Sequence, residues 1–266
     1  MGSGARAVGD GVVMGNRYLA LRLEAPMVAF GDIMIDSLGP IRETPATSAI
    51  CGLVANALGL RREQSSALSR LQERLVIACR LDQVGSRLTD LQTAQLGAKD
   101  RWWTTDGTVK ERAGGASTFD SPHIRERDYD CDVRMLVLLR LRDAVEEPTL
   151  HEVAQAVQYP ARPLFLGRKC CLPSAPMFVG FVEAVTAFVA LRSIPLLACE
   201  SRSYRSRREE PGEIVVTLPP DDPCPEGFQT VYATEWRDWP AGVHAGEQRR
   251  HRGSVARAQF AQGETL

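Results

Sequence analysis

The feature of this chain that most constrains its fold is the alternating segment Val133–Leu141. Every odd-numbered position in it is apolar, which predicts a long β-strand with one face in a hydrophobic core. Arg134 and Arg140 lie on the opposite face, which Leu136 and Leu138 make partly buried. The chain must therefore build a β-sheet around this segment.

The clearest helix is expected over residues 50–58. Apolar side chains fall there at i, i+3, i+4, i+7 and i+8, so that they form one continuous stripe. Thr47 or Ser48 can cap the start of this helix. Gly59 stands where a left-handed residue ends many helices, so we expect the helix to end just before it.

Further elements follow from similar patterns. Thr149 and Glu152 have the spacing of a capping box, which predicts that a helix begins there. Another helix is expected over about 66–75, ahead of the strand at 76–81. Further strands are expected over 18–23 and 163–166.

The order of these elements is β-α-β-β-α-β, with one additional helix after the first. This order predicts the α+β class and a ferredoxin-like, RRM-type domain. About fifty residues, Asp82–Asp132, separate the second and third strands, which should be neighbours in such a fold. We interpret this long connection as a protruding β-hairpin thumb over about 89–129. A disordered insertion is the alternative.

The whole chain is expected to divide into four parts. Residues 1–16 form a flexible lead, 17–180 the RRM-like domain, 181–245 a mostly-β C-terminal region, and 246–266 a basic tail. Within the C-terminal region we expect a helix over 182–191, strands over 213–218 and 230–234, a charged linker over 202–212 and a turn-rich loop over 219–227, arranged as a small second sheet.

Composition narrows the function. The net charge is −1, but basic residues gather in short clusters, as expected for a protein that meets RNA on one face and protein on others. The seven cysteines contain no C-x-x-C pair and the four histidines no H-x-x-x-H spacing, so we expect neither a metal site nor another cofactor. The longest apolar runs are too short to span a membrane, and the expected location is the cytoplasm.

Two clusters could bind the RNA backbone. The first is the start of the helix at Pro45–Gly52, where free N–H groups, the Ser48 hydroxyl and nearby Arg42 could seat a phosphate. The second is Arg168 and Lys169, two cations that follow a predicted strand and a glycine. Plain helix capping and an exposed basic turn are the ordinary explanations of these two clusters.

Five motifs in chain order, the last of them in two parts, resemble the CasD family, the Cas-five subunit of type I-E CRISPR Cascade. The resemblance covers roughly 18–180, with a fainter match at Arg237–Pro240. Its motifs are Leu21–Gly31, Pro45–Gly59, Leu96–Lys99, Arg127–Asp132, Pro163–Cys171 and Pro176–Phe178.

The resemblance implies a non-catalytic protein that caps the 5′ handle of the guide RNA (crRNA). It also implies contacts with the Cas-seven backbone subunit and with the large subunit that reads the PAM, and with target DNA through the complex. The implied RNA-binding residues are Arg42, Thr47, Ser48, Gly52, Arg127, Tyr129, Arg168 and Lys169. The implied thumb and partner contacts are Lys99, Arg101, Trp102, Trp103, Lys110 and Arg112.

This sequence departs from the family pattern at two places. Phe30 stands where the family commonly has Trp, and Thr47 stands where it commonly has Lys or Arg. Two other functions stay open. A metal-independent endoribonuclease would need acid–base residues, for which His123 and His151 are the mid-chain histidines. An adaptor that binds only protein is the other.

Overall fold

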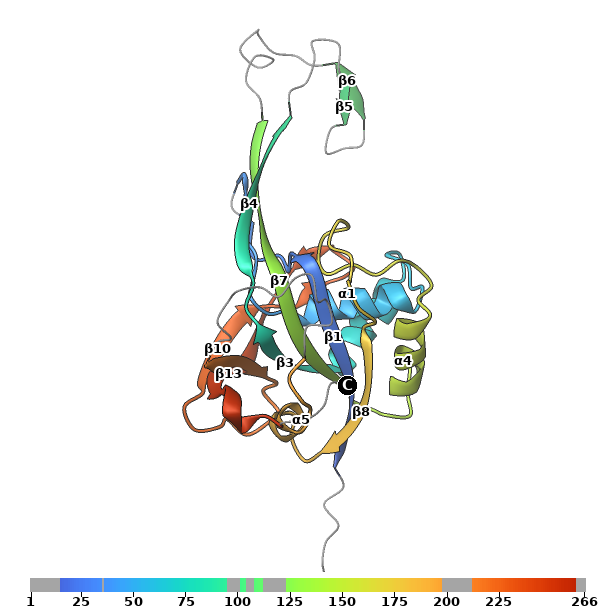
Figure 1. Cartoon of the computed structure of the whole chain (residues 1–266). Helices are drawn as coiled ribbons and strands as arrows, with labels where there is room; N and C mark the ends of the chain where they lie inside the picture. The colour runs from blue at the N-terminus through green and yellow to red at the C-terminus, as the bar shows by residue number, and fades with distance from the viewer. Residues whose placement is uncertain are drawn as a thin grey trace, which may run out of the picture.

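The computed structural model describes residues 15–34, 36–94, 101–103, 108–111, 123–197 and 212–261. Its framework is one large sheet in which the strands follow the order β10-β13-β9-β3-β7-β1-β8, all antiparallel (Figure 1). Outside this path, β4 pairs antiparallel and the short β2 parallel with β7. The strands of this sheet are β1 (Asn16–Val28), β2 (Leu38–Gly39), β3 (Leu75–Gln83), β4 (Ser86–Ala94), β7 (His123–Leu141), β8 (Phe178–Ala184), β9 (Glu213–Leu218), β10 (Gln229–Thr234) and β13 (Glu247–Ala256).

Helices lie on both faces of this sheet and enclose two cores. One core lies under α1 (Thr47–Ala57), α2 (Ser65–Arg74) and α4 (Leu150–Gln158). The other lies under α5 (Ala187–Ser193) and the short 3-10 helix at Arg257–Gln259. The predicted α+β composition is confirmed at this level, as a mixed architecture around a large antiparallel sheet. Among the described residues, no helix has the length and apolar character needed to cross a membrane.

The strand β7 is central because both of its faces are apolar in the body of the sheet. Met135, Val137 and Leu139 lie in the core under α1, whereas Leu136 and Leu138 lie in the core under α5. This explains why the face that carries the arginines in the sequence also contains leucines. The predicted strand is confirmed and extends ten residues further toward the N-terminus, to His123.

The additional part of β7 rises out of the body together with β4 (Figure 1). The two strands pair from Ser86–Cys131 to Ala94–His123. Beyond them, β5 (Arg101–Trp103) and β6 (Val109–Glu111) form a separate two-stranded unit. The long connection therefore contains a protruding antiparallel ladder at its base.

The ends of the helices follow local sequence. At the end of α1, Gly59 has φ +80, and the N–H of Leu60 bonds to the carbonyl of Ala55 at 2.9 Å, which is the predicted left-handed termination. The start of α1 differs from the prediction. Ala46 is the N-cap and makes no side-chain cap, while Thr47 and Ser48 already belong to the first helical turn.

The helix α4 begins as predicted. The Thr149 hydroxyl accepts a hydrogen bond from the Glu152 N–H, and the Glu152 carboxylate accepts one from the Thr149 N–H. Both hydrogen bonds of the capping box are present.

Two predicted elements are wrong. Residues 163–166 form no strand, because the Leu166 N–H bonds to the Cys171 carbonyl and the Leu166 carbonyl bonds to the Ala29 N–H within a loop. The strand beside β1 is instead β8. The helix expected over 182–191 starts later, because residues up to Ala184 pair with β1 and Thr186 then caps α5.

The C-terminal part of the chain also departs from expectation. The predicted strands β9 and β10 are present, but β9 pairs with β3, so that they extend the main sheet and form no second one. The residues expected as a basic tail from Gly246 form β13, which lies between β10 and β9. The charged residues of this segment favour an exposed tail in the sequence. In the fold, however, Arg250 is buried, because it forms an internal ion pair with Glu235.

Candidate nucleic-acid interface

A cavity of about 360 Å³ opens where the start of α1 meets the base of the hairpin. Four of the predicted RNA-binding residues line it together: Arg42, Ser48, Arg127 and Arg168. They come from the loop before α1, from α1 itself, from β7 and from the loop after α4. Three guanidinium groups around one cavity form a site suited to an anion such as a phosphodiester.

Arg168 is held in place from two sides. Its guanidinium lies over the ring of Tyr129 at 4.6 Å from the ring centroid. It also donates to the carbonyls of Asp128 at 2.9 Å and Gly39 at 3.3 Å. Tyr129 is only 6% exposed, so it supports Arg168 and offers little surface to a base. Lys169, the other predicted cation of this loop, is exposed beside the cavity and does not line it.

The loop that carries Arg168 depends on one glycine. Gly167 has φ +98, and a Cβ at this position would lie 1.9 Å from the carbonyl oxygen of Ala29. The Ala29 N–H in turn donates to the Leu166 carbonyl at 3.0 Å. The loop is therefore pressed against the end of β1, which gives Arg168 a defined base.

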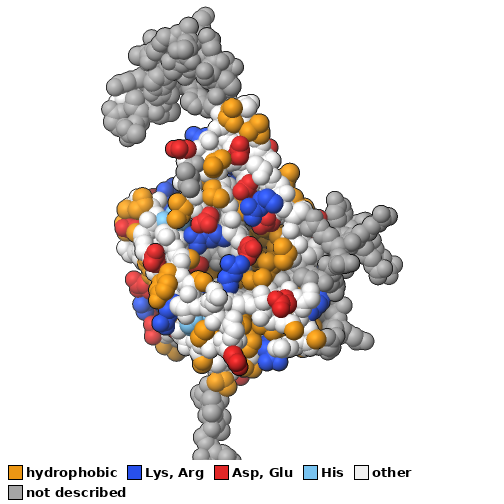
Figure 2. Space-filling view, turned by 90° about the vertical axis from the view of Figure 1, so that its left-hand side faces the viewer, with side chains coloured by type: hydrophobic (Ala, Val, Ile, Leu, Met, Phe, Trp, Pro, Cys, Tyr) orange, Lys and Arg blue, Asp and Glu red, His pale blue; other side chains and the backbone are white. Residues whose placement is uncertain are grey.

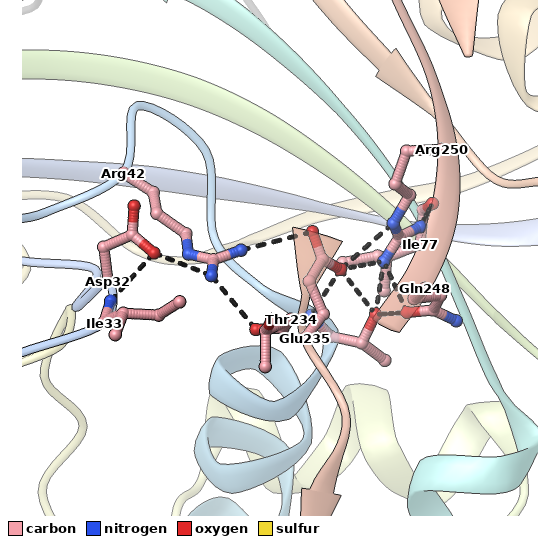
Figure 3. Close-up of polar contacts among 9 residues, drawn as sticks. Asp32, Ile33, Arg42, Ile77, Thr234, Glu235, Gln248 and Arg250 are labelled. Atoms are coloured by element: carbon pink, nitrogen blue, oxygen red, sulfur yellow. Dashed lines mark hydrogen bonds and ion pairs between the residues drawn. The ribbon is translucent and has the colours of Figure 1, made fainter. Parts of the chain in front are cut away.

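Arg42 is partly neutralised within the protein. Its guanidinium lies 2.8 Å from the carboxylate of Asp32 and donates to the carbonyl of Thr234 at 3.0 Å (Figure 3). A second carboxylate, Glu235, lies 3.9 Å away. Arg42 therefore joins the loop before α1 to the chain that follows β10, and it contributes less free charge to the cavity than Arg127 or Arg168.

Thr47 belongs to a buried network whose other members, Glu235, Gln248 and Arg250, are labelled in Figure 3. Its N–H and its hydroxyl donate to the Glu235 carboxylate at 3.2 Å and 3.1 Å. The Arg250 guanidinium donates to the same carboxylate at 2.8 Å and 3.1 Å, and to the Ile77 carbonyl at 3.0 Å. Thr47 is fully buried, so its assignment as a residue that touches RNA is corrected.

The network also changes the assignment of the helix start. A carboxylate of the protein, that of Glu235, already accepts the first N–H group of α1. Negative charge at this end stabilises a helix through the macrodipole, and Glu235 supplies it. A phosphate placed at the same point would meet a carboxylate. The arginine side chains of the cavity are the better phosphate ligands.

Gly52 lies in a second hollow that adjoins the first. This hollow has a volume of about 240 Å³. It shares Phe30, Ser48, Ala49 and Gly167 with the cavity lined by Arg42, Arg127 and Arg168, which we call the cationic cavity. Leu53, Leu164 and Phe165 line its other side, so its walls are mainly apolar. Phe30, which stands where the family commonly has Trp, thus lines both hollows.

The cavity residues that sequence reasoning does not predict include Arg237, Trp239 and His244. They lie in and between β11 (Arg237–Asp238) and β12 (Val243–His244), a two-stranded unit of the C-terminal region. The faint family match at Arg237–Pro240 was the only signal for them. Nothing in the spacing along the chain indicates that residues almost 200 positions from Arg42 close the same cavity.

The electrostatic effect of this arrangement is visible at His244. Packing against neighbouring atoms lowers the pKa of His244 below its usual range, and the positive charges of Arg237 and Arg42 lower it further. On the side of the molecule that carries β10, by contrast, positive and negative side chains are interspersed (Figure 2).

The structure describes the backbone of four of the six predicted thumb and partner contacts. Lys99 and Arg112 lie outside the described residues. Arg101, Trp102 and Trp103 form β5 and Lys110 lies in β6, where the structure describes the backbone pairing of these residues. Within the described ranges, no group of three or more His, Cys, Asp or Glu side chains is placed to hold a metal ion.

Sequence comparison shows the class to which this protein belongs, that of the CRISPR-associated proteins. The chain belongs to the family described as CRISPR-associated protein (Cas_Cas5), which matches residues 18–251. It is similar to the CRISPR system Cascade subunit CasD of Escherichia coli (strain K12), with 31% identity over 167 residues, which cover 63% of this chain and 72% of that protein.

Solved structures share the fold. A chain of a CRISPR RNA-guided surveillance complex aligns with a TM-score of 0.61 and 19% identity, over 90% of this chain and 89% of that one. The crystal structure of a Cas protein aligns with a TM-score of 0.56 and 23% identity, over 92% of this chain and 98% of that one. At such identities the likeness establishes the architecture alone.

Proposed function

We propose that this chain is a non-catalytic subunit of a type I-E Cascade and binds the 5′ handle of crRNA in the cationic cavity. Family membership and the similarity to CasD support the assembly. The observation that carries the site is the convergence of Arg42, Ser48, Arg127 and Arg168 on one cavity, because these residues come from separate segments of the chain. Arg127 and Arg168 are the main backbone ligands in this proposal.

The same proposal gives roles to the rest of the molecule. The strand order β8-β1-β7-β3, with α1 and α4 in the connections, supports a ferredoxin-like core. The ladder of β4 and β7 supports a thumb that contacts the Cas-seven backbone subunit and the large subunit. Exposed Leu91 and Ile124 on this ladder are consistent with a protein contact there, and target DNA is reached through the assembled complex.

The experiment is binding of purified protein to repeat-derived handle RNA across a salt series. We expect saturable binding, and we expect Arg127→Ala and Arg168→Ala each to weaken it and to reduce the log–log salt slope by about 0.7–1 unit. Arg192→Ala is the matched control, because Arg192 lies on α5 on the opposite face of the sheet. Unchanged affinity and slope in both pocket variants would refute the site.

The same mixtures test the two alternatives. Bound and intact RNA supports the non-catalytic role, whereas cleavage that resists chelators would support the endoribonuclease. Of the two histidines considered for cleavage, His151 is exposed on α4, and the side chain of His123 lies outside the described residues. Absence of any RNA binding, with assembly of the complex intact, would support the protein-only adaptor.

A further inference from the structure

The small unit formed by β11 and β12 is built as a wall of the cavity. Arg237 and His244 are register partners across the two strands, so their side chains lie on the same face of the unit. The Arg237 guanidinium lies over Trp239 at 5.2 Å from the ring centroid and donates to the Gly242 carbonyl at 2.9 Å. All three side chains line the cavity that contains Arg127 and Arg168.

One buried side chain fixes this unit to α2. The Gln72 amide donates to the Arg237 carbonyl at 2.9 Å, and the Gln72 carbonyl accepts from the Arg237 N–H at 3.3 Å. Gln72 is 1% exposed and is not among the residues that line the cavity. It can therefore be changed without removing a residue that lines the cavity.

A second anchor fixes the start of the unit. Glu235, two residues before Arg237, joins α1 through Thr47. It joins β13 through Arg250, as Figure 3 shows. Its carboxylate also occupies the helix start that would otherwise attract a phosphate. The segment that follows β10 therefore has two effects. Its Glu235 carboxylate occupies the N-terminus of α1, where a phosphate could otherwise bind, and its Arg237 guanidinium lines the cavity.

We infer that the β11–β12 unit is the second wall of the RNA site, that Arg237 binds an RNA phosphate from it, and that Gln72 is its positioning residue. This inference rests on the proposed function and adds residues to the same site. A phosphate between Arg127, Arg168 and Arg237 would be held from three segments of the chain, which suits a bent strand.

The experiment measures handle-RNA binding across a salt series for the full chain and for Arg237→Ala, Arg237→Lys and Gln72→Met, with melting as the folding control. We expect Arg237→Ala to lower the log–log slope by about 0.7–1 unit and Arg237→Lys to keep it. Gln72→Met should weaken RNA binding, because Arg237 loses the hydrogen bonds that hold its backbone. It should also return the pKa of His244 toward its usual value, because the Arg237 guanidinium opposite His244 moves. A purely structural role of Gln72 would leave that pKa unchanged in the folded protein.

The wild-type protein supplies a measurement that does not depend on the folding of any variant. Titration of the His244 ring by NMR, with and without handle RNA, should show a higher pKa in the complex because a phosphate lies nearby. Two results would overturn the inference. One is an unchanged pKa of His244 in a saturated complex. The other is wild-type affinity and salt slope in Arg237→Ala when Arg168→Ala has lost them. Wild-type protein that binds no handle RNA would instead refute the proposed function itself.

Discussion

Arg168 and Lys169 are adjacent cations in very different settings. Arg168 donates to two backbone carbonyls and stacks on Tyr129, whereas Lys169 is exposed beside the cavity. We therefore expect Arg168→Ala to weaken RNA binding much more than Lys169→Ala does. Arg168→Ala should also lower the free energy of unfolding by about 1–3 kcal/mol, because two hydrogen bonds from a charged group are lost.

Isothermal titration with handle RNA and thermal melting of the two single variants would check this. Lys169→Ala serves as the matched control, since it removes the same charge from the same loop. Equal losses of affinity in the two variants would show that the loop contributes only its total charge.

His244 predicts a pH dependence. Its pKa lies below the usual 6.5 in the free protein, so the ring is neutral at neutral pH. A bound phosphate raises this pKa, and RNA binding then takes up a proton. The additional affinity is fully present below the free-state pKa and is lost as the pH rises through the bound-state pKa. We expect tighter binding at pH 5.5 than at pH 8, and a smaller difference in His244→Asn.

Single residues also show the limits of sequence reasoning about the site. Arg42, Ser48, Arg127 and Arg168 were chosen from local patterns and family position, and the structure gathers them around one cavity. Thr47 had the same local support but is buried against Glu235. Local patterns predict that a residue starts a helix. They do not predict which distant carboxylate reaches that helix.

At the scale of elements, the loop 166–168 sets the direction of Arg168. Gly167→Ala would place a Cβ against the Ala29 carbonyl in a left-handed conformation. We expect a loss of about 1–3 kcal/mol in the free energy of unfolding from the backbone strain alone, together with weaker RNA binding. Denaturant unfolding and RNA titration would measure both effects.

Gly31→Ala is the control for this substitution. Gly31 also lines the cavity, but a Cβ there meets nothing within 4 Å. Its variant should keep the stability and the affinity of the wild type. A stable Gly167→Ala protein with unchanged binding would show that the loop relaxes at little cost.

Elements with strong local signals were predictable, and those that depend on distant partners were not. β7, the end of α1 and the capping box of α4 follow from periodicity and turn chemistry. Residues 163–166 alternate like a strand, but β8 takes the place beside β1. β13 was missed because its inward Arg250 looks polar in the sequence, although Glu235 neutralises it in the fold.

At the scale of the whole molecule, the C-terminal strands belong to the main sheet. β13 lies between β10 and β9, and Arg250 is 3% exposed against Glu235. Removal of residues 246–266 would take Arg250 away from the buried Glu235 carboxylate and leave Arg42, at 3.9 Å, as its remaining cation. Loss of one partner of a buried ion pair costs about 3–5 kcal/mol. We expect this truncated chain to be insoluble or unfolded, and not merely shorter.

Circular dichroism and gel filtration of the truncated protein would test this expectation. Removal of residues 262–266 alone is the control, because it leaves the whole of β13 in place. A folded, RNA-binding protein that ends at residue 245 would contradict this description of the sheet.

The continuity of β7 has a mechanical consequence. At about 3.3 Å per residue, its 19 residues span about 60 Å, from the outer end of the ladder with β4 through the middle of the sheet. Arg127 and Tyr129 lie on this same strand. The hairpin is therefore a lever that pivots beside the cavity lined by Arg127 and Arg168. Under the proposed function, a neighbour that twists the outer end would apply torque at Arg127, and RNA bound to Arg127 would fix the angle at which the outer end is presented.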